Sequence, residues 1–211
     1  MSTRADGDFH LEVDPADLHT RRQAFVALPW SQPDEVHGAH VRRVERAGEH
    51  DRAVADGLVT DVDDAVLGIW VGDCAPVALV GAAGAIGAVH AGWRGIEGGV
   101  LGRGVEALRA IDDGPVEAVL GPCIHPCCYA FGDVDLERLA AAFGSDVVGA
   151  TSDGRRALDV PAAVRSALAF VGVDVVTSIG GCTGCEADRW WSHRARGERS
   201  RQVMAVWRRA A

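Results

Sequence analysis

Residues 66–95 read VLGIWVGDCAPVALVGAAGAIGAVHAGWRG and hold two short apolar runs, each of which ends in a reactive side chain. The first run, Val66–Val71, leads to Cys74. The second run, Ala85–Val89, leads to His90. Runs this short, β-branched and almost free of charge are typical of strands buried on both faces. Because open α/β sheets usually place ligands where strands end, we predict that this thiol and this imidazole meet in one site.

The rest of the chain predicts an α/β fold with a mostly parallel or mixed sheet, because strands and helices alternate through its second half. No internal repeat or linker interrupts this pattern, so we expect a single domain over residues 1–211. Further strands are predicted near His40–Val44, after the turn at Asp56-Gly57, and at Val116–Leu120, Val173–Ile179 and Gln202–Arg208. Helices are predicted from Pro15 with Asp14 as N-cap, over Gly95–Ile111, from a cap at Asp133 to Phe143, and from Asp159 to near Gly172.

Composition narrows the class of protein. The 211 residues carry a formal net charge of −9, which argues against a general nucleic-acid binder. No apolar run is long enough to span a bilayer, and the opening residues lack the pattern of a secretory signal. We therefore expect a cytoplasmic protein that contacts neither nucleic acid nor membrane. All 21 basic residues are Arg, which excludes a Schiff-base lysine and the lysine of a phosphate-binding P-loop.

The residues alone leave two interpretations of Cys74 and His90 beyond simple burial. In one, His90 is the base that activates a Cys74 nucleophile. In the other, one thiolate and two imidazoles bind a metal with an open fourth position, as in some catalytic zinc sites. His37 is the natural third ligand because it precedes a predicted strand, but spacing does not bring it to the other two.

Five further cysteines follow in two groups. Cys182-Thr-Gly-Cys185 has the spacing of a zinc knuckle, and two earlier thiols could complete a four-cysteine site. Only one such knuckle is present, however, and export signals are absent. We therefore expect reduced thiols without a structural metal in both groups, which are Cys123, Cys127, Cys128, Cys182 and Cys185.

An arginine-rich segment near the C-terminus surrounds two tryptophans. A solvated, salt-bridged face is the common outcome for such a run, although basic residues beside aromatic ones can also hold phosphates and stack on bases. In an acidic chain, this local cluster marks where a small anion would bind. Its members are Arg189, Arg194, Arg196, Arg199 and Arg201, around Trp190-Trp191.

Several motifs together resemble those of the laccase-domain family, which is variously described as polyphenol oxidase, purine nucleoside phosphorylase and peptidoglycan editing factor. They are Val36-His37-Gly38, Asp73-Cys74-Ala75-Pro76, His90-Ala91-Gly92-Trp93-Arg94-Gly95, Gly121-Pro122 through Cys127-Cys128-Tyr129, and Cys182-Thr183-x-Cys185. The opening, Ser2-Thr3-Arg4-x-Asp6-Gly7, is also similar, so that the resemblance covers nearly the whole chain.

The resemblance implies a layered α/β fold similar to that of the cytotoxic necrotising factor. It implies a zinc site made by His37, Cys74 and His90, phosphorolysis of adenosine, guanosine or inosine and methylthioadenosine, and adenosine deamination. The partners would be a purine nucleoside and phosphate, and the protein a monomer or homodimer. The chain departs from the family at Glu35, where Gln is usual, and in a shorter N-terminal segment.

Roles for the remaining candidates follow from that activity. Arg94 lies at a glycine-flanked turn after a strand and can offer its guanidinium fork to phosphate. Arg4 and Glu35 are further candidates for substrate binding. The leaving purine needs a proton, for which Asp73 and Glu35 are the candidates.

Three other functions compete with phosphorolysis. A copper-dependent polyphenol oxidase could use two histidines and one cysteine, but multicopper chemistry needs a further histidine cluster, and the eight histidines form no His-x-His pair. A Cys–His hydrolase or peptidoglycan-precursor editing enzyme would use Cys74 as nucleophile. A zinc-dependent interaction module would use the later cysteines and the arginine-rich segment.

Overall fold

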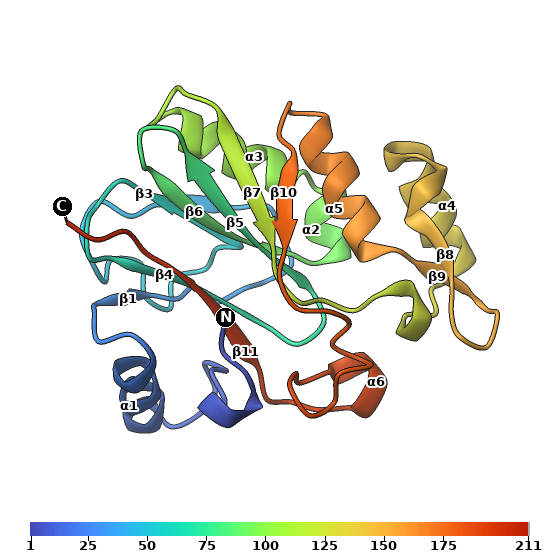
Figure 1. Cartoon of the computed structure of the whole chain (residues 1–211), viewed down its shortest axis with the longest axis horizontal. Helices are drawn as coiled ribbons and strands as arrows, with labels where there is room; N and C mark the ends of the chain where they lie inside the picture. Colours follow the sequence, from blue (N-terminus) through green and yellow to red (C-terminus); the bar gives the residue numbers. More distant parts are fainter. Residues whose placement is uncertain (211) are drawn as a thin grey trace.

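A computed structural model describes residues 1–210, which fold around two mixed β-sheets (Figure 1). The six-stranded sheet consists, in spatial order, of β10 (Val175–Ser178), β7 (Val116–Leu120), β5 (Ala75–Gly81), β6 (Ile86–Ala91), β3 (Gly57–Thr60) and β2 (Val41–Arg43). The three-stranded sheet consists of β1 (Trp30–Ser31), β4 (Val66–Val71) and β11 (Gln202–Val206). A separate hairpin pairs β8 (Val148–Ala150) with β9 (Arg156–Leu158).

Strand directions confirm an α/β fold with mixed sheets. Only the two outer pairs of the six-stranded sheet, β10 with β7 and β2 with β3, are parallel, and the central pairs are antiparallel. The alternative of a mostly parallel sheet is therefore wrong. Of these central pairs, only β5 and β6 are joined directly by a hairpin, whereas β3 and β7 reach their partners through longer connections.

The central strands of the six-stranded sheet, β5, β6 and β3, are buried on both faces. On one face, Leu58 and Ala88 pack with Ile69 of the three-stranded sheet. On the other face, Val59 and Val89 pack against α3 (Val100–Arg109) and α5 (Val160–Ala169). Consecutive residues of one strand thus point into different cores, as the two-residue period of a strand requires. Figure 1 shows the three-stranded sheet and α1 (Pro15–Phe25) on the side opposite α3 and α5.

The opening stretch, residues 66–95, contains three strands rather than the two predicted. Val66–Val71 forms β4 as expected, and the second run forms β6. Between them, Ala75–Gly81 forms β5, which pairs with β6 as a hairpin. Because β4 lies in the three-stranded sheet, the chain changes sheets at the Gly-Asp-Cys segment that ends in Cys74.

Three predicted helices are confirmed. Asp14 caps α1 by accepting hydrogen bonds from the backbone N–H groups of Ala16 and Asp17. The Asp159 side chain caps α5 in the same way, although α5 ends earlier than predicted. The helix α4 spans Asp133–Phe143, but its N-cap is Gly132, so the predicted capping role of Asp133 is wrong.

The predicted helix over Gly95–Ile111 is two helices. The short helix α2 covers Trp93–Glu97, and α3 starts at Val100. Gly99 separates them with a φ of 82°, a left-handed conformation that glycine adopts without steric cost. Because α2 starts two residues earlier than predicted, Arg94 lies in its first turn.

The remaining elements are short. The strands predicted over Val173–Ile179 and Gln202–Arg208 are β10 and β11, each shorter than expected. Single-turn helices are η1 (Arg4–Asp6), η2 (Pro126–Cys128), η3 (Ser145–Val147) and α6 (His193–Arg196). No helix in residues 1–210 is long and apolar enough to cross a membrane.

Candidate metal centre and substrate cavity

The register of the β5–β6 hairpin brings Cys74 and His90 together. Ala75 pairs with Ala91, and Pro76 pairs with His90. Cys74 directly precedes β5 and therefore faces the end of β6, where His90 is the penultimate residue. The predicted meeting of thiol and imidazole thus occurs, but at the start of one strand and the end of its antiparallel neighbour rather than at two equivalent strand ends.

His37 joins this pair from the loop before β2. One ligand atom from each of His37, Cys74 and His90 lies within 4.8 Å of the others. The two imidazole rings meet edge to face, with centroids 4.8 Å apart. His90 is buried, whereas His37 is exposed, so this group of donors opens toward solvent on one side.

Asp56, which the sequence analysis did not single out, holds both histidines in place. Its Oδ1 lies 2.9 Å from Nδ1 of His90 and accepts a 2.8 Å hydrogen bond from the backbone N–H of His37. Its Oδ2 accepts a 2.8 Å hydrogen bond from the N–H of Gly38. A carboxylate on one imidazole nitrogen fixes the ring and leaves Nε2 for a metal. Because Asp-Gly is a common turn signal, sequence alone pointed only to a turn here.

Gly92 leaves the space into which the three donors converge. A Cβ atom at this position would lie 2.9 Å from Cδ2 of His37 and 3.1 Å from Sγ of Cys74. The backbone itself is ordinary, with φ of −73°, so the requirement for glycine comes from this space and not from backbone strain. One thiolate and two imidazoles around such a space fit a zinc ion with an open fourth position.

Charge at this centre favours an ionised thiol. Burial alone would raise the pKa of Cys74, but the charge of His90 and hydrogen bonds from His37 and His90 outweigh it and hold that pKa at about 6. Burial opposes a charge on His90, yet Glu35 and Cys74 together raise its pKa well above the usual value. A thiolate is both a zinc ligand and a nucleophile, so this feature serves either interpretation of Cys74.

Glu35 lies behind the metal centre and not in the cavity. It is buried, its Oε1 accepts a 2.8 Å hydrogen bond from the N–H of Trp70, and its Oε2 lies 3.6 Å from Nδ1 of His90. Burial raises the pKa of this carboxyl to about 8, despite the opposing charge of His90. Glu35 is not one of the described residues that line the cavity, so the structure does not support its predicted contact with substrate.

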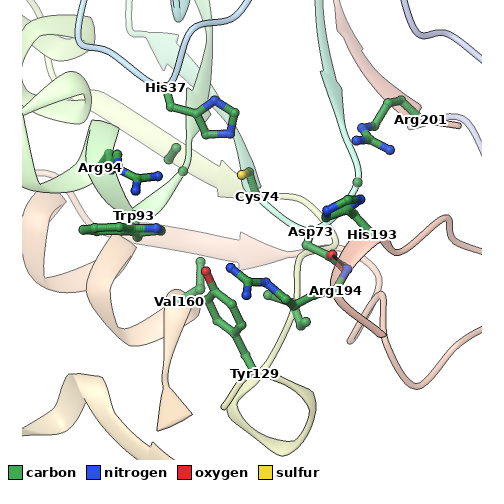
Figure 2. A pocket seen from close by; sticks show the side chains of 14 residues that line it. His37, Asp73, Cys74, Trp93, Arg94, Tyr129, Val160, His193, Arg194 and Arg201 are labelled. Carbon is green, nitrogen blue, oxygen red and sulfur yellow. Dashed lines mark hydrogen bonds between the residues drawn. The ribbon is translucent and has the colours of Figure 1, made fainter. Parts of the chain in front are cut away.

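A cavity of about 300 Å³ opens beside the three donors (Figure 2). His37 and Cys74 form one side, and the rings of Trp93 and Tyr129 form others. Three arginines and a histidine also line it, which are Arg94, Arg194, Arg201 and His193. A concentration of cations in a chain of net charge −9 marks a site for an anionic group.

Two of the three arginines are held against aromatic rings. The guanidinium carbon of Arg94 lies 4.4 Å from the centroid of Trp93, and that of Arg194 lies 5.2 Å from the centroid of Tyr129. Stacking of this kind orients a guanidinium while leaving its N–H groups free to donate. Arg194 and Arg201 belong to the arginine-rich segment of the sequence, so part of that segment does line a site suited to a small anion.

Asp73 lines the cavity, but its carboxylate is occupied by hydrogen bonds from the segment after β10 and from α6. Its Oδ1 accepts hydrogen bonds from the hydroxyls of Thr183, at 2.7 Å, and Ser192, at 2.6 Å. Its Oδ2 accepts from the N–H of Arg194 at 2.6 Å. Asp73 thereby holds Arg194 at the cavity rim, which is a positioning role, and the proton donation predicted for it stays a prediction.

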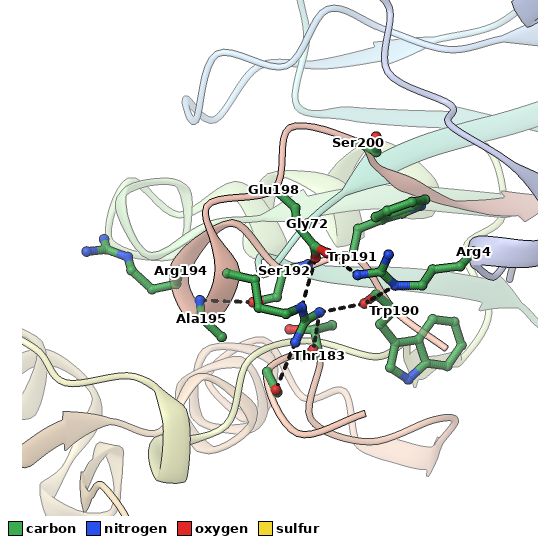
Figure 3. A network of polar contacts seen from close by, with 12 residues as sticks. Arg4, Gly72, Thr183, Trp190, Trp191, Ser192, Arg194, Ala195, Glu198 and Ser200 are labelled. Atoms are coloured by element: carbon green, nitrogen blue, oxygen red, sulfur yellow. Dashed lines mark hydrogen bonds and ion pairs between the residues drawn. The ribbon is translucent and has the colours of Figure 1, made fainter. Parts of the chain in front are cut away.

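Arg4 lies away from the cavity. Its guanidinium stacks 3.9 Å over the ring of Trp191, donates to the carbonyl of Trp190 and pairs with Glu198 (Figure 3). Arg4 thus fastens the N-terminus to the segment before α6, and it is not among the described residues that line the cavity. No local pattern indicates these contacts, because the partners of Arg4 lie more than 180 residues away.

Comparison with known proteins finds a matching family model and named relatives. A family model described as "Multi-copper polyphenol oxidoreductase laccase" matches residues 5–209. "Purine nucleoside phosphorylase YlmD" of Geobacillus stearothermophilus is 32% identical over 95% of this chain and 82% of its own length. "Adenosine deaminase RL5" from an unknown prokaryotic organism is 30% identical over 96% of this chain and 84% of its own length.

The fold agrees with that match. The crystal structure of YlmD from Geobacillus stearothermophilus superposes with a TM-score of 0.83 at 30% identity and covers 96% of this chain and 85% of that one. The chain therefore belongs to the laccase-like polyphenol oxidoreductase family. Its relatives include proteins named for nucleoside phosphorolysis and for adenosine deamination.

Proposed function

We propose that this chain, as a member of that family, is a zinc-dependent purine nucleoside phosphorylase that also deaminates adenosine. Residues 1–211 would form one catalytic domain in the cytoplasm. Its substrates would be adenosine, guanosine or inosine, and methylthioadenosine, together with phosphate. The observation that carries the proposal is a donor group with an open side, His37, Cys74 and His90, in the same cavity as three arginines.

The donor group supports zinc as the metal. A zinc ion with three protein ligands and an open fourth position acts as a Lewis acid and lowers the pKa of a water molecule there. The chain's part is to keep Cys74 ionised and to orient both imidazoles through Asp56. Copper can also bind two histidines and one cysteine. A multicopper oxidase needs more histidines, and the second group of potential ligands within residues 1–210 consists of cysteines alone.

The cavity supports a flat, partly apolar substrate with an anionic co-substrate. Its volume of about 300 Å³ is at the small end of small-molecule sites. Trp93 and Tyr129 offer aromatic faces on which a purine can stack. Arg94, Arg194 and Arg201 offer charged N–H donors to phosphate oxygens, and a guanidinium fork can bind two of them at once.

The two reactions make different demands on these residues. Phosphorolysis needs phosphate held beside the sugar as the bond to the base breaks, which is a task for the arginines. Deamination at C6 of adenine needs a water-derived nucleophile and no phosphate. Both need the base held in place, so the aromatic residues serve both reactions.

Product analysis tests the proposal. The purified protein is incubated with adenosine at several phosphate concentrations, and adenine, ribose 1-phosphate and inosine are quantified. Adenine and ribose 1-phosphate in equal amounts, rising with phosphate, support phosphorolysis, and inosine that is independent of phosphate supports deamination. If the protein neither phosphorolyses nor deaminates adenosine, and phosphorolyses none of guanosine, inosine and methylthioadenosine, the proposed function is refuted.

One alternative retains a specific observation in its favour. A pKa of about 6 leaves Cys74 as a thiolate at neutral pH, as a cysteine hydrolase requires. Such an enzyme would work without metal and would be inactivated by alkylation of Cys74 alone. Hydrolysis of an amide or muramoyl substrate by the metal-free protein would favour this alternative over phosphorolysis.

A further inference from the structure

Four cysteines from two distant parts of the chain form a second cluster of potential metal ligands. Cys127 and Cys128 lie in η2, and Cys182 and Cys185 lie in the loop after β10. We call them the four-cysteine cluster. All four Sγ atoms lie within 4.8 Å of one another, and Cys185 is exposed whereas Cys182 is buried. Cys123 lies outside this cluster and is buried in the main core.

The spacing of the sulfur atoms matches a tetrahedral zinc site. Four Zn–S bonds of about 2.3 Å in tetrahedral geometry put neighbouring sulfur atoms about 3.8 Å apart. In the cluster, Sγ of Cys127 lies 3.8 Å from those of Cys128 and Cys182 and 3.5 Å from that of Cys185. Sγ of Cys128 lies 3.4 Å from that of Cys185. All four thiols are free, and these separations are far longer than a disulfide bond.

Backbone hydrogen bonds and a close approach at Gly184 hold the cysteines of the cluster in position. The N–H of His125 points at Sγ of Cys182 from 3.3 Å, and the N–H of Cys185 donates to the carbonyl of Cys182 at 3.1 Å. A Cβ atom on Gly184 would lie 2.7 Å from Cβ of Cys128, so only glycine lets the two segments approach this closely. Hydrogen bonds that fix ligand orientation in this way are typical of metal sites.

Arg196 secures the same loop from outside. Its guanidinium donates to the carbonyls of Thr183, at 3.1 Å, and Gly184, at 2.9 Å. It also donates to the carbonyl of Trp190 and to Glu198, so the loop is joined to the segment that carries α6. The cluster is therefore built into the fold and is not a chance meeting of flexible side chains.

We infer that the four-cysteine cluster binds a structural zinc ion, in addition to any metal at His37, Cys74 and His90. On binding, each thiol that is still protonated releases its proton to solvent, and no electron is transferred. All four positions would be filled by protein, so this site is structural rather than catalytic. The expectation of thiols without metal came from seeing only one Cys-x-x-Cys knuckle, and the adjacent pair Cys127-Cys128 takes the place of the second.

The bound ion would stabilise one wall of the cavity. Tyr129 directly follows Cys128, and Thr183 lies between the two later cysteines of the cluster. The hydroxyl of Thr183 donates to Asp73, which in turn holds the N–H of Arg194. Loss of the ion should therefore loosen the positions of Tyr129 and Arg194 while leaving the donors His37, Cys74 and His90 together.

Metal analysis of single-residue variants tests this site independently of catalysis. The full chain is purified under reducing conditions and dialysed against a weak chelator, and zinc is measured per chain in the wild type, Cys185→Ser, Cys74→Ser and Cys123→Ala. The first variant changes an exposed member of the cluster, and the last removes a buried thiol outside it. Cobalt substitution of the same proteins reports thiolate ligation through sulfur-to-metal absorption.

We expect two zinc ions in the wild type and in Cys123→Ala, and one in each of Cys185→Ser and Cys74→Ser. Zinc that is lost only from Cys185→Ser would support the cluster and count against the proposed catalytic centre. Zinc content that is the same in Cys185→Ser and the wild type would overturn the inference. So would a disulfide within the cluster, found by peptide mapping of protein that was purified and denatured without reductant.

Discussion

The Oδ1 atom of Asp56 lies 2.9 Å from Nδ1 of His90 and accepts the backbone N–H of His37. One buried carboxylate thus orients two of the three donors around which the proposed function is built. We predict that Asp56→Asn weakens zinc binding by roughly 10- to 100-fold, the usual cost of losing an outer-shell partner. Competition with a chromophoric chelator measures this affinity. Asp153→Asn, an exposed change, is the control, and equal affinity in both variants would contradict the role of Asp56.

Gly92→Ala should separate metal binding from folding. The added methyl group would lie 2.9 Å from the His37 ring and 3.1 Å from the Cys74 sulfur, so the donors must move apart. We expect zinc affinity to fall at least tenfold, with little change in the urea midpoint. Gly132→Ala is the matched control, since nothing lies within 4 Å of its added methyl group. Wild-type zinc affinity in Gly92→Ala would show that the donors do not converge on this space.

Arg94→Ala should affect phosphorolysis more than deamination. Arg94 lines the cavity, and loss of a charge-assisted hydrogen bond costs about 1.5–3 kcal/mol. The KM for phosphate should therefore rise about tenfold or more, since about 1.4 kcal/mol corresponds to a factor of ten. Adenine and inosine are quantified from adenosine across a phosphate titration, with Arg103→Ala on the exposed side of α3 as control. An equal fall in both products at every phosphate concentration would mean that Arg94 does not bind phosphate.

Glu35 should make stability depend on pH. Burial raises the pKa of this carboxyl from 4.5 to about 8, so between these values the folded protein binds a proton that the unfolded chain has released. The contribution of Glu35 to stability is therefore fully present below pH 4.5 and is lost as pH rises toward 8. Glu35→Gln cannot bind this proton. The unfolding free energy of the variant, relative to that of the wild type, should therefore increase from pH 5 to pH 8. Urea titrations at both pH values check this, and a constant difference would refute it.

Some elements of the fold could be predicted from the sequence and others could not, and the difference has physical causes. Asp14 and Asp159 identified helix starts because capping depends on residues next to one another. The break between α2 and α3 at Gly98-Gly99 was missed because an apolar period does not show where a helix ends and restarts. Strand β5 was missed because it lies between the two apolar runs that predict strands. Local signals suffice where the interaction itself is local.

The residues of the candidate site also divide into those that the sequence predicts and those that it does not. Cys74 and His90 could be paired from sequence because each follows a short apolar run, although the hairpin that joins them was not predicted. Asp56 could not be found, since its partner His90 is 34 residues away and reaches it only through the antiparallel pairing of β3 with β6. The same holds for the Asp73 contacts with Thr183 and Ser192, which span more than 100 residues.

The proposed function requires that zinc held by His37, Cys74 and His90 supports chemistry on adenosine. The most direct measurement follows adenine and inosine formation, with phosphate present, by protein that has been stripped with a chelator and then supplied with zinc or with copper. We predict that stripping abolishes both products, that zinc restores both, and that Cys74→Ser stays inactive with either metal. Full activity of the stripped protein, or recovery with copper and not zinc, would show that zinc at these three residues does not support the reaction.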